Sequence, residues 1–147
     1  MRINTYTVQL VREKGINYEA EHEATTPDTA YKAMCDIFKA DVQTEEHLYM
    51  FTLNTKGKIV GAFEIGHGGL AQCGVTPATV VRNAVLTNAY GVILAHNHPS
   101  GDPEPSSADI SLTKRMRQAL DIIGISLADH IVIGDGRYIS LKECGVI

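Results

Sequence analysis

The sequence predicts a single mixed α/β domain, and three observations support this. Strand-like runs alternate along the chain with segments whose apolar residues recur at helical spacing. The length of 147 residues suits one domain that buries a core without disulfides. Hydrophobic residues make up 44% and charged residues 20%, as in ordinary soluble globular domains. We therefore treat residues 1–147 as one domain, in which residues 1–44 form an N-terminal strand and helix segment.

The first elements predicted are a strand and a helix. Residues 3–11 (INTYTVQLV) alternate in polarity and are rich in Thr, Tyr and Val, which favours a strand. Thr26-Pro27-Asp28 combines a capping residue, a proline and an acid, which is typical of a helix start. A helix over residues 27–39 is predicted from the apolar positions that follow at helical spacing: Ala30, Ala33, Met34, Ile37 and Phe38.

The core sheet is predicted to begin with a hairpin. The runs HLYMFTL (47–53) and KIVGAFEI (58–65) are strand-like, and residues 54–57 between them form a loop that ends in glycine. The stretch 66–69 (GHGG) is too rich in glycine for regular structure. It is expected to turn, or to let the backbone approach another group closely.

A second helix and a buried strand come next. Thr76-Pro77 repeats the capping and proline signal, and Gly91 is expected to close the helix in a left-handed conformation. The apolar stripe of this helix consists of Val80, Val81, Ala84, Val85 and Leu86. The run VILAHN (92–97) then predicts a buried strand.

The C-terminal third predicts one more helix and two strands. The helix starts at Ser106 or Ser107 and runs to about Ile123, and Gly124 ends it. Residues 125–133 and 137–141 are strand-like and flank the turn Gly134-Asp135-Gly136, which completes the α/β pattern.

Composition and charge disfavour several classes of protein. Cys35, Cys73 and Cys144 are odd in number and form no C-x-x-C pair, so neither a disulfide framework nor a thiolate zinc site is expected. No apolar run of about 18 residues and no signal-peptide pattern occurs, which predicts a cytoplasmic protein that does not enter a membrane. The net charge of −4 makes nucleic acid a disfavoured, though open, partner. The oligomeric state cannot be read from the sequence.

The segment from His96 to Asp109 carries the clearest chemical pattern. His96 and His98 lie two residues apart at a strand end, so both side chains point to the same face. The loop 99–105 contains three prolines and one glycine, and it returns the chain stiffly towards Asp109 in the first turn of the next helix. Two histidines and one aspartate leave a fourth tetrahedral position for water, which is the pattern of a catalytic Zn²⁺ site.

Two further residues are candidates for catalysis. Glu64 lies in an apolar strand expected to pair near VILAHN, and it is the candidate general base. Ser106 lies one helical turn before Asp109 and is a candidate hydrogen-bond donor to a developing oxyanion. Ser106 and Asp109 also form an S-x-x-D capping pattern, which alone explains both residues without catalysis. His67 and His130 either support the metal ligands from behind through hydrogen bonds or are ordinary hydrogen-bonded residues.

These residues also resemble a known family. Glu64, the H96-N-H98-P-S-G stretch and S106-x-x-D109 together look like the signature of JAMM (JAB/MPN) metalloproteases. More narrowly, HNHPSGDPEPSSAD and DHIVIGDGRYISLKE resemble the JAB domain of RadC-like proteins over about residues 45–147. The resemblance implies a three-layer, cytidine-deaminase-like α/β/α sandwich with a mixed sheet. It also implies zinc on His96, His98 and Asp109, Glu64 as acid/base and Ser106 as oxyanion donor.

We therefore expect a zinc-dependent peptidase or isopeptidase that acts on an unknown protein or peptide substrate. One alternative is a DNA-repair-associated RadC-like module that acts on or near DNA, and another is a zinc-binding scaffold without turnover. A zinc deaminase is excluded, because the H-x-E and P-C-x-x-C motifs are absent. An HNH nuclease is excluded because its motif is not a contiguous H-N-H.

Overall fold

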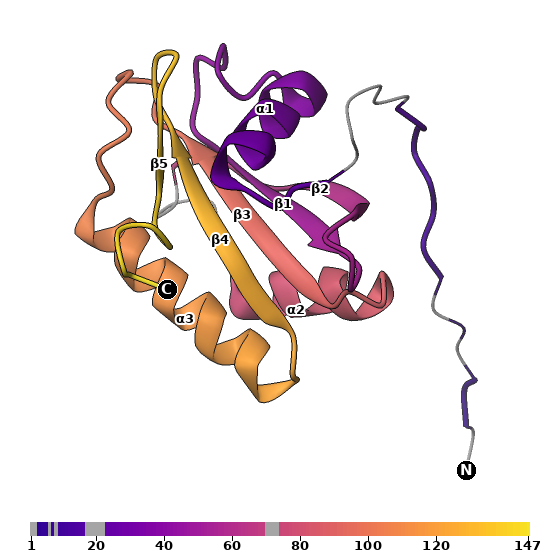
Figure 1. The fold of residues 1–147 in the computed structure, drawn as a ribbon. Coiled ribbons are helices and arrows are strands. Elements are labelled where there is room, and N and C mark those ends of the chain that lie inside the picture. Colours follow the sequence, from indigo (N-terminus) through magenta and orange to yellow (C-terminus); the bar gives the residue numbers. More distant parts are fainter. Residues whose placement is uncertain (1–2, 6, 8, 17–22, 70–73) are drawn as a thin grey trace.

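The computed structural model describes residues 3–5, 7, 9–16, 23–69 and 74–147. In this part of the chain, three helices lie around a five-stranded sheet with the order β2-β1-β3-β4-β5 (Figure 1). Only β3 and β4 pair in parallel; the other neighbours are antiparallel, so the sheet is mixed as predicted. The elements are α1 (Pro27–Phe38), β1 (His47–Leu53), β2 (Ile59–His67), α2 (Pro77–Leu86), β3 (Gly91–Asn97), α3 (Ser107–Ile122), β4 (Ser126–Ile133) and β5 (Tyr138–Ser140).

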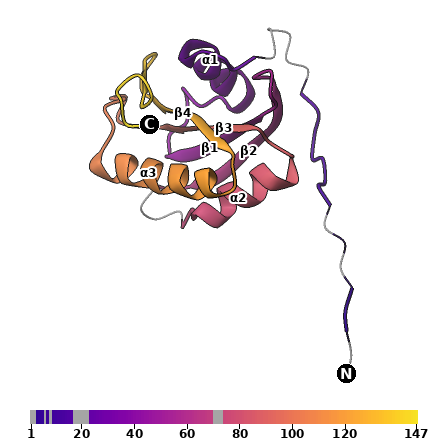
Figure 2. The same cartoon turned by 60° about the horizontal axis from the view of Figure 1, so that its bottom comes forward.

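The helices cover both faces of the sheet, which confirms the three-layer α/β/α arrangement. Figure 2 shows α1 on one side of the strands and α2 with α3 on the other. Two hydrophobic clusters fill the two interfaces. The α1 side contains Ala33, Met34, Tyr49, Phe51, Ile93 and Ala95, among others. The α2/α3 side contains Leu48, Met50, Val80, Leu94, Met116 and Leu120, among others.

Strand alternation determines which side chains reach each face. In β1, Tyr49 and Phe51 pack towards α1, whereas Leu48 and Met50 pack towards α2 and α3. In β3, which is buried throughout, Leu94 faces α2 and α3. His96, two residues further on, therefore faces the same side as α3.

The strand predicted over residues 3–11 is wrong for the residues that the structure describes. Residues 3–5, 7 and 9–11 have no strand pairing, while residues 6 and 8 lie outside the described part of the chain. Ile3 and Val11 are 74% and 78% exposed, so the alternating pattern does not bury an apolar face. A strand needs a pairing partner and a buried face, and a favourable local pattern does not replace either.

Two other boundaries differ from the sequence predictions. Gly66 and His67 were expected outside regular structure, but β2 continues through them because β1 supplies partners for both. Gly91 was expected to close α2, yet it begins β3. The left-handed residue after α2 is Asn88, with φ 52°, a conformation that asparagine tolerates. Among the described residues, no helix is both long enough and apolar enough to cross a membrane.

Candidate metal centre

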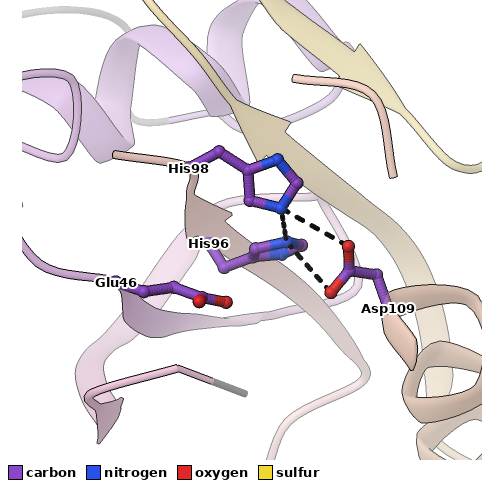
Figure 3. A group of neighbouring side chains, drawn as sticks. All are labelled: Glu46, His96, His98 and Asp109. Atoms are coloured by element: carbon purple, nitrogen blue, oxygen red, sulfur yellow. Dashed lines mark hydrogen bonds and ion pairs between the residues drawn. The ribbon is translucent and has the colours of Figure 1, made fainter. Parts of the chain in front are cut away.

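The end of β3 and the start of α3 bring the three predicted ligands together, with one acid that was not predicted. Figure 3 shows the side chains of Glu46, His96, His98 and Asp109 converging. One ligand atom from each lies within 4.8 Å of the others. The Nε2 atoms of His96 and His98 are 3.0 Å apart. The two Asp109 carboxylate oxygens lie 3.4 Å from these two nitrogens, one from each.

The loop after β3 is held in place by the turn between β4 and β5. The main-chain N–H of His98 donates to the carbonyl of Ile133 (2.7 Å), which extends the β3–β4 ladder by one residue. The N–H of Asp135 donates to the carbonyl of Gly101 (2.9 Å). A Cβ on Gly134 would lie 2.4 Å from that carbonyl oxygen, so only glycine allows this approach. The close packing fixes where His98 points.

The hydrogen bonds of the α3 capping box also orient the side chain of Asp109. The N–H of Ser106 donates to Asp109 Oδ2 (2.7 Å), and the N–H of Asp109 donates to Ser106 Oγ (3.1 Å). The same Asp109 carboxylate faces His96 and His98. The capping role and the metal-ligand role predicted for the S-x-x-D pattern are therefore compatible, because the capping bonds hold the Asp109 carboxylate next to the two histidines.

The tautomer of His98 follows from its second nitrogen. His98 Nδ1 lies 2.7 Å from the carbonyl oxygen of Asp102. A carbonyl oxygen only accepts, so Nδ1 carries the hydrogen and donates. In the neutral ring, Nε2 then presents a lone pair towards His96 and Asp109.

The tautomer of His96 follows from a buried chain of three hydrogen bonds. Thr113 Oγ1 donates to the main-chain carbonyl of Asp109 (2.6 Å), so it can only accept from His130 Nδ1 (2.6 Å). Complete burial, which is the largest cause, lowers the pKa of His130 well below its usual value, so His130 is neutral and its Nε2 accepts. The donor to that nitrogen is His96 Nδ1 (2.8 Å). A neutral His96 thus also presents an Nε2 lone pair.

Asp109 completes an electron-rich cluster. Burial alone raises the pKa of its carboxyl, but the contact with His96 and the bonds from Ser106 lower that pKa well below its usual value. With His96 and His98 in their neutral forms, the ionised carboxylate of Asp109 and two imidazole lone pairs converge on one point. Such a group is mutually repulsive until a cation lies among its members, and two nitrogens with one oxygen suit a divalent transition metal. The residues fit a metal ion.

Glu46 is positioned by an amide clamp from Asn97. The side-chain oxygen of Asn97 accepts from the N–H of His47 (2.8 Å), and its NH₂ donates to the carbonyl of Glu45 (2.8 Å). Asn97 is only 3% exposed and lies between the two histidine ligands. The clamp fixes the backbone on both sides of Glu46, so its carboxylate is held beside the ligands.

Glu64 does not join this group. Its Oε1 contacts Nδ1 of His47 at 2.7 Å, and its side chain is 48% exposed. In β2 it pairs with Tyr49, which packs on the α1 side, so strand alternation directs it away from the α3 side. Its expected role as a base is untested, and the acid beside the histidines is Glu46.

A signal for Glu46 exists in the sequence. Glu46 immediately precedes β1 and lies two residues before Leu48. An extended chain at this point puts both side chains on the face that β1 presents to α3. Glu45 and Glu46 are adjacent acids, however, and choosing between them requires the register of β1. Of the two histidines left open, His130 contacts His96 directly, whereas His67 contacts Glu45 outside this centre.

The chain of hydrogen bonds gives a prediction for metal affinity. Thr113→Val keeps the shape of a fully buried side chain but removes the acceptor for His130 and the donor to Asp109. We expect zinc affinity to fall by about 10- to 100-fold, as for other residues that orient metal ligands. Competition with a chromophoric chelator measures this. Thr113→Ser keeps the hydroxyl and should restore the affinity; equal affinities for Thr113→Val and the unsubstituted protein would show that the chain does not orient His96.

Comparison with known proteins is consistent with this geometry. The family model described as RadC-like JAB domain matches residues 24–146. A protein of Carboxydothermus hydrogenoformans named UPF0758 protein is 43% identical over 116 residues, covering 79% of this chain and 50% of that protein. A UPF0758 protein of Clostridium acetobutylicum is 48% identical over 103 residues, covering 70% of this chain and 45% of its own length.

A third relative extends the similarity along the chain. A UPF0758 protein of Clostridium perfringens is 37% identical over 139 residues, covering 95% of this chain and 60% of the relative. The chain thus spans about half the length of the curated relatives that it matches.

Proposed function

The chain belongs to the RadC-like JAB domain family, and on this basis we propose that it is a zinc-dependent hydrolase of the JAMM type. Its substrate is a peptide or isopeptide bond of a protein. The observation that carries the proposal is the convergence of His96, His98 and Asp109 with an additional acid, Glu46. With Glu46 acting as a base and not as a ligand, three protein ligands would leave a fourth position for water, as in catalytic zinc sites.

Zinc is the metal that this donor set favours. Imidazole nitrogens are borderline ligands that Mg²⁺ and Ca²⁺ disfavour, whereas Zn²⁺ binds both imidazole nitrogen and carboxylate oxygen. A zinc ion held by these residues would supply Lewis-acid catalysis, polarising a carbonyl group and lowering the pKa of a water molecule.

Glu46 is the residue that we propose as general base, in the role expected for Glu64. Its carboxylate lies within 4.8 Å of the ligand atoms, which places it within reach of a water molecule held there. It would accept a proton from that water and then deliver the proton to the leaving amine. The Asn97 clamp supports this role because it fixes the backbone that carries Glu46.

Ser106 is the residue that we propose as oxyanion donor. Its Oγ accepts from the N–H of Asp109, so its own hydrogen remains to donate elsewhere. The side chain is exposed and lies beside the ligand Asp109. A hydroxyl at this place can donate to a substrate carbonyl oxygen as negative charge develops on it.

A substrate screen tests the proposed function. The zinc-loaded protein would be incubated with C-terminally extended peptides and with conjugates of small β-grasp proteins, and cleavage would be read by mass spectrometry. We expect hydrolysis of at least one amide bond that a chelator abolishes and added zinc restores. If no zinc-loaded preparation cleaves any amide in this panel, the chain is better described as a metal-binding scaffold.

A further inference from the structure

A second cluster of metal-ligating side chains lies where β1 begins and β2 ends. Glu45, His47 and His67 each offer one ligand atom, and these atoms lie within 4.8 Å of one another. His47 and His67 are directly paired across the two strands. Their imidazole rings stack with centroids 4.3 Å apart and an interplanar angle of 12°. The cross-strand register therefore fixes both histidines on one face.

This cluster is separate from the centre formed by His96, His98 and Asp109. Glu45 and His47 lie on either side of Glu46 in the sequence, but their ligand atoms group with that of His67 and not with that of Glu46. His47 also stacks near Tyr49, at 5.8 Å and 4°, on the side of the sheet that faces α1. The two clusters share no side chain.

The charges of the cluster favour a divalent cation. His67 Nε2 hydrogen-bonds to the carboxylate of Glu45, and His47 Nδ1 bonds to Glu64 Oε1 at 2.7 Å. Among the described residues, each of these carboxylates pairs with a histidine and not with a Lys or Arg. The two carboxylates bring negative charge to the two imidazole rings, and a divalent ion between them would balance that charge.

Exposure makes the cluster accessible to an ion. The side chains of His67 and Glu45 are 56% and 64% exposed, whereas that of His47 is 13% exposed. The largely buried imidazole of His47 holds one ligand in place, and the two exposed side chains have room to reorient around an ion. Competition from water makes such a surface site weaker than the centre at His96, His98 and Asp109.

We propose that Glu45, His47 and His67, with Glu64 beside them, form a second and more weakly bound metal site for Zn²⁺ or a similar divalent ion that binds imidazole nitrogen. This proposal is independent of the hydrolase activity. The site adjoins the backbone that carries Glu46, because the N–H of Gly68 donates to the carbonyl of Glu46 (2.8 Å). Metal bound to His47 and His67 therefore joins the two strand ends that hold this acid.

A zinc titration of the full chain tests the proposal. Isothermal titration calorimetry of the metal-free protein should show two binding steps, one tight and one weaker. His67→Ala should weaken the second step at least tenfold and leave the first unchanged. His98→Ala should remove the tight step and keep the weak one. Glu143→Gln removes an exposed carboxylate elsewhere and should change neither step.

Each outcome addresses one site. An unchanged weak step in His67→Ala, or a single step in the unsubstituted protein, would overturn the second site whatever happens at the first. The second site would be supported if His67→Ala is the only variant that loses the weak step. It would be supported further if the imidazole ¹⁵N resonances of His47 shift during the second step. Because His67 is exposed, its replacement should not disturb the fold.

Discussion

Replacing His98 by alanine is expected to reduce the zinc content from about one ion per chain to nearly none after dialysis, without unfolding the domain. His98 supplies one of three proposed ligands, and an aspartate with a single histidine holds zinc poorly. The fold should persist because the backbone N–H of residue 98 still donates to Ile133 and both hydrophobic clusters remain intact. Elemental analysis with a thermal unfolding curve measures both quantities.

The matched control for this variant is His67→Ala. It also removes one imidazole, but from outside the proposed centre, so the tight zinc should remain. Unchanged zinc in His98→Ala would overturn the proposed centre. Unfolding of the metal-free protein would instead mean that the metal supports the fold, as in small zinc domains.

Replacing Glu46 by glutamine is expected to lower the turnover rate by about 10²- to 10⁴-fold, the range typical of a lost general base. Glutamine has the size of glutamate and keeps hydrogen bonding, but it does not accept the proton of water at neutral pH. The three proposed ligands are unchanged and should retain zinc, so the loss should appear in kcat rather than in KM. The measurement is steady-state kinetics on an amide substrate found in the screen, with zinc content determined in parallel.

Glu64→Gln is the control that separates the two acids. Glu64 contacts His47 and is half exposed, so its replacement should leave turnover near that of the unsubstituted protein. If Glu64→Gln is inactive and Glu46→Gln is active, with zinc retained in both, the assignment is reversed. Loss of zinc in Glu46→Gln would instead make Glu46 a ligand.

The sequence alone determined the parts of this site that depend on local spacing. The two-residue interval between His96 and His98 places both on one side of a strand end, because strands alternate with a period of two. The S-x-x-D pattern at Ser106 fixes the start of α3 and the orientation of Asp109, because a capping box closes within four residues. The apolar periodicities likewise predicted most of the helices and strands of a mixed α/β domain, whereas the three layers were implied by the resemblance to JAB domains.

Tertiary structure decided which elements meet. Glu46 rather than Glu64 reaches the histidines because β1 lies beside β3, while the register of β2 directs Glu64 to the opposite face. The bonds from His96 through His130 and Thr113 join residues up to 34 positions apart. Residues 3–11 alternate like a strand but have no pairing in the described part of the chain. Spacing fixes the face on which a residue lies within its own element, but only the pairing and packing of elements fix what that face contacts.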